Sequence, residues 1–300
     1  MSQQDPLAHI NRILRLKEIS AQLQILTAAV GTIRQRSLVL ESDLSQGDTA
    51  TFAFEGECFR QLAAMQHALH FVRGQGYGTE TIAAEVACLS RFLPQPPRLA
   101  VDIGGNVGDY TAALRARWAG LPVHVFEPSA TNITKLLARY EGQAEVRINP
   151  HAVSDFDGHA TLHADVSGSG MGSLSHRDLR NRGLSFDAAE PVQVLRFERY
   201  WREVLQACPV DLVKLDIEGH ELAAVRGFGD ALAAVRVMQF EFGGCNIDTR
   251  TFWKDFHGLL TGAGFALYRI TPLGPEPLAR YDEHDEFYST TNFIAVNNRG

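Results

Sequence analysis

A glycine-rich turn between an apolar run and a helical pattern constrains the fold of this chain more than any other feature. The turn is VDIGGNVG over residues 101–108 and it begins in a run of aliphatic side chains. Glycine tolerates positive φ and lets the backbone approach a ligand, because it has no Cβ. A strand, a turn of this kind and a helix are typical of the first unit of a parallel sheet that binds a ligand at its edge.

After Pro97 the sequence alternates between short apolar runs and amphipathic stretches, which predicts an α/β domain with a parallel sheet covered on both faces. Helices are expected near residues 108–119 and 129–141. The last two strands flank a long acidic loop and are predicted to form an antiparallel hairpin. The predicted strands are residues 99–103, 123–126, 146–151, 212–216, 237–242, 266–270 and 292–296.

The residues before the PQPP segment at 94–97 have helical patterns, with helices expected near residues 57–73 and 79–93. We therefore predict a helical region over residues 1–97 and a separate α/β domain over residues 98–300. One apolar stripe in the first region has the 3-4-3-4-3 spacing of a helix face, and either packing within the domain or a homo-oligomer seam explains it. The stripe consists of Leu16, Ile19, Leu23, Leu26, Val30 and Ile33.

Charge, hydropathy and cysteine usage exclude several classes. Lys and Arg number 28 against 35 Asp and Glu, a formal net charge of -7, which argues against nucleic-acid partners and anionic membranes. No apolar stretch reaches the roughly 18 residues of a membrane span, and the N-terminus lacks a secretory signal pattern, so we expect a cytoplasmic protein. Four scattered cysteines without a C-x-x-C pair predict neither a disulfide framework nor a zinc ribbon.

The spacing of the glycine turn favours a ligand with an amino-acid end over a dinucleotide. A dinucleotide fingerprint needs glycine where this chain has Asn106 and Asp109. Backbone N–H groups at the start of a helix can hold a carboxylate, while Asp102 can favour an ammonium group. S-adenosylmethionine has both groups. The residues predicted to bind it here are Asp102, Gly104, Gly105, Asn106 and Gly108.

Acids after the next strands extend this prediction. Glu127, followed by Pro128, lies about twenty residues beyond the turn, where a carboxylate can accept hydrogen bonds from two ribose hydroxyls. Ala152, Val153 and Asp155 follow the third strand, where an adenine would lie. Asp155 is either an acceptor for the adenine amine or a plain turn residue. A purely structural alternative for Asp102 and Glu127 is a favourable interaction of each carboxylate with a helix N-terminus.

Four stretches in this order resemble the FkbM family of S-adenosylmethionine-dependent methyltransferases. They are VDIGGNVG at 101–108, VFEP at 125–128, AVSD at 152–155 and VDLVKLDIEGHE at 210–221. The resemblance spans residues 99–296 and leaves the helical N-terminal region uncovered; Gly105 stands where alanine is common in the family. It implies a Rossmann-like, seven-stranded and mostly parallel sheet with an antiparallel last strand. It also implies methyl transfer to oxygen, often on a sugar or polyketide hydroxyl.

The last of these stretches supplies the predicted catalytic residues at the end of a strand, where open α/β sheets bind ligands. We expect Asp216 to face the reaction centre and the cofactor, Glu218 to orient the acceptor or the cofactor, and His220 to take the acceptor proton. Lys214 completes this set or forms an ordinary ion pair. Acids at this position can also simply complement the dipole of the following helix.

A metal-dependent alternative uses the same region. Asp216, Glu218 and Glu241 are oxygen ligands of the kind that Mg²⁺ prefers, and the ion would acidify the acceptor hydroxyl; a metal-free site is the favoured prediction. Glu241 and Asn246 are the predicted acceptor contacts, and the SGSGMGS segment at 167–173 is either a lid or a surface loop.

The sequence thus predicts an O-methyltransferase acting on a hydroxyl of a sugar, glycan or glycan precursor. Three alternatives stay open: a polyketide, a lipid-linked acceptor or an amine could replace the sugar. A non-catalytic scaffold that binds the cofactor and forms a homo-oligomer through its N-terminal helices is the alternative from a different class.

Overall fold

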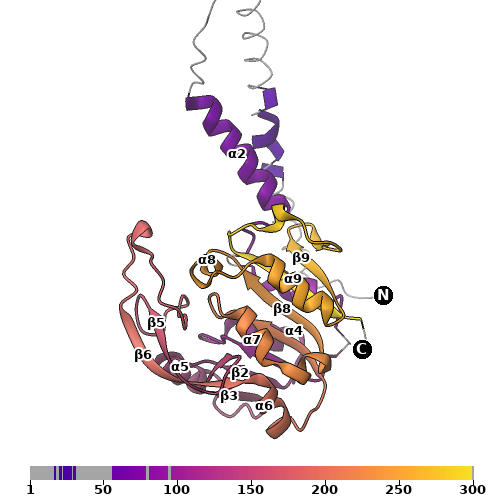
Figure 1. The fold of residues 1–300 in the computed structure, drawn as a ribbon. Coiled ribbons are helices and arrows are strands. Elements are labelled where there is room, and N and C mark those ends of the chain that lie inside the picture. Colours follow the sequence, from indigo (N-terminus) through magenta and orange to yellow (C-terminus); the bar gives the residue numbers. More distant parts are fainter. Residues whose placement is uncertain are drawn as a thin grey trace, which may run out of the picture. The chain divides into compact units, whose positions relative to one another are not determined.

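The computed structural model describes residues 17, 20–21, 23–28, 30–31, 56–78, 81–93 and 96–298 (Figure 1). The chain divides into two compact units, of which the first comprises residues 1–75 and 271–273 and the second residues 76–270 and 274–300. In the first unit, the described residues between 17 and 31 are helical, and α2 spans Gly56–Val72. Leu16, Ile19 and Ile33 of the predicted stripe lie outside the described residues, as does Thr79, the predicted start of the next helix.

The second unit is built on an eight-stranded sheet with the order β10-β9-β11-β8-β7-β1-β2-β3. The strands β3, β2, β1, β7 and β8 run parallel, whereas β11 is antiparallel to both β8 and β9. This confirms the predicted mostly parallel sheet with an antiparallel last strand, to which β10 adds a short eighth strand at one edge. The bounds are β1 Ala100–Ile103, β2 Val123–Phe126, β3 Val146–Asn149, β7 Val210–Leu215, β8 Val235–Phe242, β9 Phe265–Thr271, β10 Gly274–Pro277 and β11 Thr291–Asn297.

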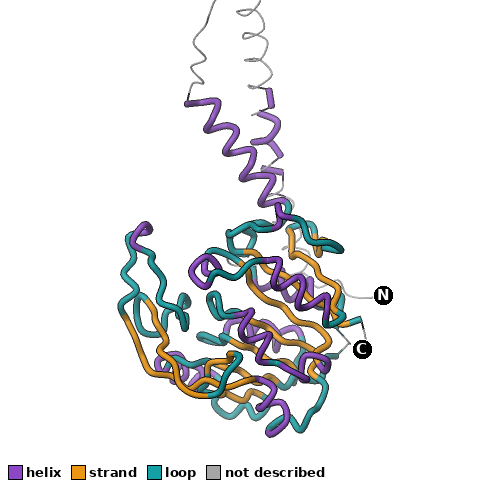
Figure 2. The backbone as a smooth tube through the Cα atoms, in the orientation of Figure 1, coloured by secondary structure: helices purple, strands orange, loops and turns teal. Residues whose placement is uncertain are grey.

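Helices cover both faces of this sheet, as Figure 2 shows. Every residue of β1 and β7 is buried, as expected for parallel strands with helices on both sides. Because crossovers between parallel strands are almost always right-handed, this strand order puts α4 and α5 on one face and α7 on the other. The helix bounds are α3 Ile82–Leu89, α4 Asp109–Arg117, α5 Ala130–Arg139, α6 Phe197–Glu203, α7 Glu221–Gly227, α8 Cys245–Thr249 and α9 Trp253–Gly262, with 3-10 turns η1 Arg180–Arg182, η2 Gly229–Ala234 and η3 Glu283–Asp285.

A second sheet of three strands lies beside the main one and was not predicted. It consists of β4 Ala152–Ser154, β5 Gly158–Ala164 and β6 Ala188–Arg196 in the order β4-β6-β5. The sequence does not indicate β5 and β6, because most of their side chains are exposed or half-buried and few are β-branched. The predicted third strand of the main sheet also ends earlier, at Asn149, whose side-chain amide donates to the carbonyl of Val125.

An aromatic cluster holds α9 against the sheet. Phe240 of β8 stacks on Phe256 and Trp253 of α9 and on Phe293 of β11, with ring centroids 5.1, 5.9 and 5.7 Å away. All four side chains are buried. These aromatics are core residues and not part of a ligand surface, and they pack α9 against β8 and β11.

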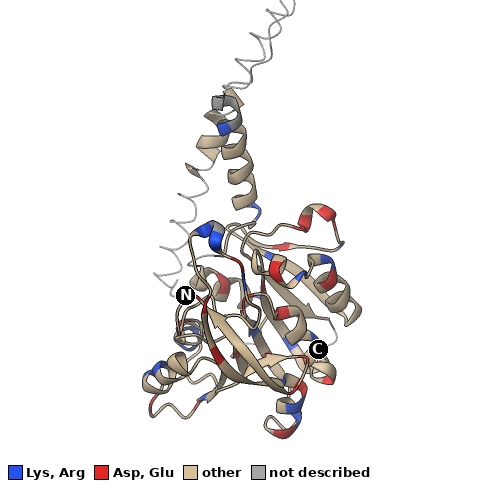
Figure 3. Cartoon of the chain, turned by 60° about the vertical axis from the view of Figure 1, so that its left-hand side comes forward, with Lys and Arg blue, Asp and Glu red and all other residues tan. Residues whose placement is uncertain are grey.

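None of the helices in the described ranges has the length and apolar composition needed to cross a membrane. Acidic and basic side chains are interspersed over the elements of the larger unit (Figure 3).

Candidate active site

The glycine turn after β1 is pressed against the residue that follows β7. Gly104 has a φ of +87°, and a Cβ at this position would lie 1.8 Å from the carbonyl oxygen of Asp216. The next glycine is equally constrained, because a Cβ on Gly105 would lie 2.1 Å from Cγ1 of Val125. The alanine expected at position 105 in relatives would therefore require Val125 to move. The turn brings the predicted cofactor and catalytic residues together.

Glu127, at the end of β2, joins two backbone turns. Its carboxylate accepts hydrogen bonds from the N–H of Asn106 at 2.8 Å and from the N–H of Ser129 at 2.9 Å. Burial raises the pKa of Glu127, and the two backbone N–H groups oppose that rise. The side-chain oxygen of Asn106 accepts from Asn132 of α5 at 3.0 Å. The glycine turn and the start of α5 are thus fixed by one acid.

Asp102 is fully buried beneath the turn. Its Oδ2 accepts a hydrogen bond from the hydroxyl of Thr111 on α4 at 2.6 Å, while Oδ1 has no hydrogen-bond partner among the described residues. Burial raises the pKa of this carboxyl, and Lys214 and Thr111 counteract that effect. A buried acceptor without a donor is unfavourable, so Asp102 is suited to a hydrogen-bond donor or an ammonium group from a ligand.

A cavity of about 140 Å³ opens between the glycine turn and the three-stranded sheet. It is also lined by five residues of the predicted lid segment, namely Ser167, Gly168, Ser169, Gly170 and Gly172. Asp102, Gly105, Gly108 and Asp155 do not line it; Oδ1 of Asp155 instead accepts from the hydroxyl of Ser154 at 3.3 Å. The predicted residues that line the cavity are Gly104, Asn106, Glu127, Pro128, Ala152, Val153, Asp216 and His220.

Three acids gather at the ends of β7 and β8. One carboxylate oxygen each of Asp216, Glu218 and Glu241 lies within 4.8 Å of the other two. Nζ of Lys214 contacts Asp216 at 2.7 Å, and Nη1 of Arg177 contacts Glu218 at 2.9 Å. Burial, together with the charge of Asp216, raises the pKa of Glu218 to about 8. Burial and neighbouring acids also raise the pKa of Glu241 well above its usual range. The cluster can hold a proton or a cation.

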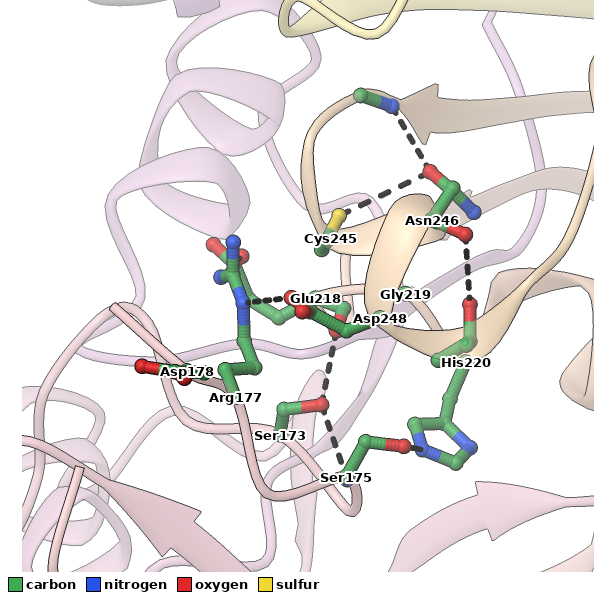
Figure 4. Close-up of polar contacts among 12 residues, drawn as sticks. Ser173, Ser175, Arg177, Asp178, Glu218, Gly219, His220, Cys245, Asn246 and Asp248 are labelled. Carbon is green, nitrogen blue, oxygen red and sulfur yellow. Dashed lines mark hydrogen bonds and ion pairs between the residues drawn. The ribbon is translucent and has the colours of Figure 1, made fainter. Parts of the chain in front are cut away.

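His220 lies directly before α7 and lines the cavity. One ring nitrogen, Nε2, is 2.8 Å from the hydroxyl oxygen of Ser175 (Figure 4). Burial lowers the pKa of the imidazole, which keeps the ring neutral near pH 7. A neutral imidazole at the cavity wall can accept a proton.

Lys214 is buried below the acid cluster in a network that begins on α3. Its Nζ lies 4.7 Å from the ring centroid of Tyr110, whose hydroxyl donates to Oε1 of Gln239 at 2.7 Å. The amide of Gln239 in turn donates to Glu85 of α3 at 2.6 Å. Burial by itself would lower the pKa of Lys214, but Asp216, Asp102 and Glu85 raise it. Lys214 therefore stays a cation and compensates Asp216.

The sequence analysis did not predict the roles of Ser173, Ser175, Arg177 and Glu85. Ser173 ends the predicted lid segment and the other three lie outside the recognised motifs. The partners that these four residues have in the site are 41 to 154 positions away. Arg177 belongs to none of the motifs named in the sequence. Its burial next to two carboxylates is a property of the fold alone.

Asn246, a predicted acceptor contact, is buried inside the turn that begins α8. Its side-chain oxygen accepts from the N–H of Gly243 at 2.8 Å, and its amide donates to the hydroxyl of Thr251 at 2.8 Å. The structure therefore gives Asn246 a local role in shaping the loop after β8. Glu241, the other predicted contact, lies in the acid cluster.

Comparison with known proteins links this site to a family. Residues 102–267 match the model of the Methyltransferase FkbM domain. A curated relative, Methyltransferase 1 of Beauveria bassiana, is 23% identical over 144 residues, which cover 43% of this chain and 58% of the relative. This chain thus matches little more than half of that protein.

Two solved structures are similar in fold. The methyltransferase FkbM from Methylobacillus flagellatus is 15% identical, with a TM-score of 0.43, covering 80% of this chain and 52% of that one. An O-methyltransferase from Bacillus cereus, solved in complex with SAH, is 12% identical, with a TM-score of 0.41, covering 85% of this chain and 97% of that one.

Proposed function

Because the chain belongs to the FkbM methyltransferase family, we propose that it transfers a methyl group from S-adenosylmethionine to a hydroxyl of a sugar, glycan or glycan precursor. One observation carries the proposal. A single cavity is lined at once by the glycine turn, by Glu127 and by Asp216 and His220, so the groups proposed to bind the cofactor and to accept the proton share one space.

The residues around the cavity fit the cofactor. Asp102 does not line the cavity, but its Oδ1, buried beneath the turn without a donor among the described residues, is the acceptor proposed for the ammonium group. Glu127 retains acceptor capacity for ribose hydroxyls, since a carboxylate has about four lone-pair sites and two are used. Ala152 and Val153 provide an apolar wall for the adenine. Bound S-adenosylmethionine supplies an electrophilic methyl group on a positively charged sulfur. The sulfur becomes neutral when the methyl group is transferred.

The chain itself has to position the acceptor hydroxyl and remove its proton. In the proposed reaction, His220 accepts this proton as the acceptor oxygen attacks, because its ring is neutral and faces the cavity. Asp216, held by Lys214, provides negative charge beside the reacting centre. Arg177 donates to Oε2 of Glu218, and the other carboxylate oxygen of Glu218 orients the acceptor.

A divalent cation is a second way to acidify the acceptor hydroxyl. Asp216, Glu218 and Glu241 would hold it, because their oxygens already lie within 4.8 Å of one another and repel when ionised. Lys214 and Arg177 already neutralise two of these charges, which favours the metal-free version. Full methyl transfer after dialysis against EDTA supports that version, and loss that Mg²⁺ restores supports the metal.

Calorimetric titration with SAH and methyl transfer from radiolabelled S-adenosylmethionine test the proposal. We expect SAH to bind with one site per chain. We also expect label in carbohydrate fractions of a cell extract, with a mass increase of about 14 Da on the product. Absence of SAH binding rejects every methyltransferase version. Binding with label only in lipid, polyketide or amine fractions rejects the sugar acceptor.

A further inference from the structure

One chain segment, residues 167–177, touches both sides of the candidate site. Its first half lies over the cofactor side, where Ser167, Gly168, Ser169, Gly170 and Gly172 line the cavity. The hydroxyl of Ser167 is 2.7 Å from that of Thr131 on α5. Gly168 packs so closely on α5 that a Cβ would come within 2.7 Å of Thr131 and 2.9 Å of Asn132. A ligand in the cavity therefore meets this half of the segment.

The second half is tied to the turn at 216–220. Every second residue contributes one contact, as Figure 4 shows. The hydroxyl of Ser173 donates to the carbonyl of Glu218 at 2.8 Å, and the hydroxyl of Ser175 is 2.8 Å from Nε2 of His220. Nη1 of Arg177 donates to the carboxylate of Glu218 at 2.9 Å. The segment thus reaches the proposed acceptor side directly after leaving the cavity.

Arg177 connects this turn to a third element. While Nη1 contacts Glu218, its Nε donates to Asp248 of α8 at 3.0 Å. The Arg177 side chain is 6% exposed, whereas the side chains of Glu218 and Asp248 are 20% and 24% exposed. Glu218 has a positive φ of 54°, which a residue with a Cβ adopts only when its surroundings hold it there. Without Arg177, both carboxylates would lose the cation that pairs with them.

We propose that Arg177 is a positioning residue that couples ligand binding in the cofactor cavity to the acceptor side. When segment 167–177 packs against the ligand, Arg177 holds Glu218 and α8 in place. The inference rests on the proposed function, since SAH is the ligand expected in the cavity. It predicts that cofactor binding orders residues 216–221 and 245–249, although only the former include cavity-lining residues.

Hydrogen–deuterium exchange of the full chain with and without saturating SAH tests this inference. In the wild type we expect SAH to slow exchange roughly tenfold or more in residues 167–172, 216–221 and 245–249. In Arg177→Ala, we expect the slowing to persist in 167–172 and to fall below about twofold in 245–249. Arg180→Ala is the matched control, because Arg180 is exposed, lies three residues away and pairs with the neighbouring Asp178.

The outcomes separate the inference from the proposed function. If Arg177→Ala transmits SAH-dependent protection to residues 245–249 as well as the wild type does, the inference is overturned and the proposed function stands. If SAH does not bind the wild type, both fail. Should Arg177→Ala not fold, Arg177→Lys replaces it. Lysine keeps the charge but cannot reach both carboxylates in a fork, so we expect SAH-dependent protection to persist in residues 216–221, which include cavity-lining residues, and to fall in residues 245–249.

Discussion

The two halves of the candidate site satisfy their acids in different ways. On the cofactor side, Glu127 is held by backbone N–H groups from residues 21 and 2 positions away. On the acceptor side, Glu218 is held by the side chain of Arg177, 41 positions away, and Asp216 by the buried Lys214. The first half is stabilised by turns that the local sequence encodes. In the second half Lys214 lies two residues from Asp216 in the chain, whereas Arg177 is brought near Glu218 only by the fold.

This difference predicts that the acceptor side carries out proton transfer and that the cofactor side binds the ligand. Backbone donors fix a carboxylate in place as a binding group. The acid cluster on the other side contains groups whose pKa burial raises, such as Glu218 at about 8, and this is a common property of sites that move protons. Variants of the two halves should therefore change different measured quantities.

The largest effect is expected from Asp216→Asn on the acceptor side. Removing the charge beside the reacting centre should lower kcat for methyl transfer by about two to four orders of magnitude, while the Kd for SAH changes by less than about threefold. Radiometric assay and calorimetry measure the two quantities. Asp230→Asn is the control, since Asp230 lies on the surface and pairs with Arg202. A larger loss in affinity than in kcat would place Asp216 on the cofactor side.

Glu221 should make folding stability depend on pH. It is fully buried, and burial raises its pKa to about 7, against the hydrogen bonds from the N–H groups of Ile217 and Gly219. A carboxyl whose pKa is higher in the folded state gives stability that is lost as pH rises through that value. We expect the stability of the wild type, relative to Glu221→Gln, to fall by up to about 3 kcal/mol between pH 4.5 and 7.

Denaturant unfolding of both proteins across this pH range provides the measurement. Glu141→Gln serves as the control, because Glu141 is exposed. A stability difference that does not vary with pH would show that Glu221 titrates normally.

On the cofactor side, Glu127→Gln should weaken SAH binding with little change in kcat at saturating cofactor. Loss of charge-assisted hydrogen bonds to the ligand predicts a Kd about 10 to 100 times higher. Calorimetry measures it, with the stability of the variant followed in parallel, since Glu127 also holds the N–H groups of Asn106 and Ser129. An unchanged Kd would contradict the ribose contact.

The smallest effect on the site is expected from the first unit. We propose that the N-terminal helices form a homo-oligomer seam. On α2, Leu62 and Leu69 are seven positions apart and are 40% and 51% exposed. Leu69→Glu should reduce the mass measured by light scattering to that of a smaller assembly and leave SAH affinity within about twofold. An unchanged mass would contradict the seam.

The sheet was predictable from sequence to a large extent because its signals are local. β2 was predicted at the residues where it is found, and the other strands of the main sheet except β10 were located within a few residues. The strands β5 and β6 were missed, since their half-exposed faces carry no clear alternation. The boundary predicted at Pro97 remains a prediction, although α3 belongs to the same compact unit as the sheet.

The sequence by itself determined the glycine turn, Glu127 and the acids of the DxEG stretch. Each of these lies at the end of a strand that the local sequence pattern is enough to recognise. Lys214 lies two residues from Asp216 in the chain, but only the tertiary structure decided that Arg177 pairs with Glu218. Arg177 and Glu85 come from segments without a motif, and a side chain's burial and partners over such separations depend on packing rather than on local pattern. Electrostatic pairing in a dry interior is set by proximity in space, which the linear sequence does not encode.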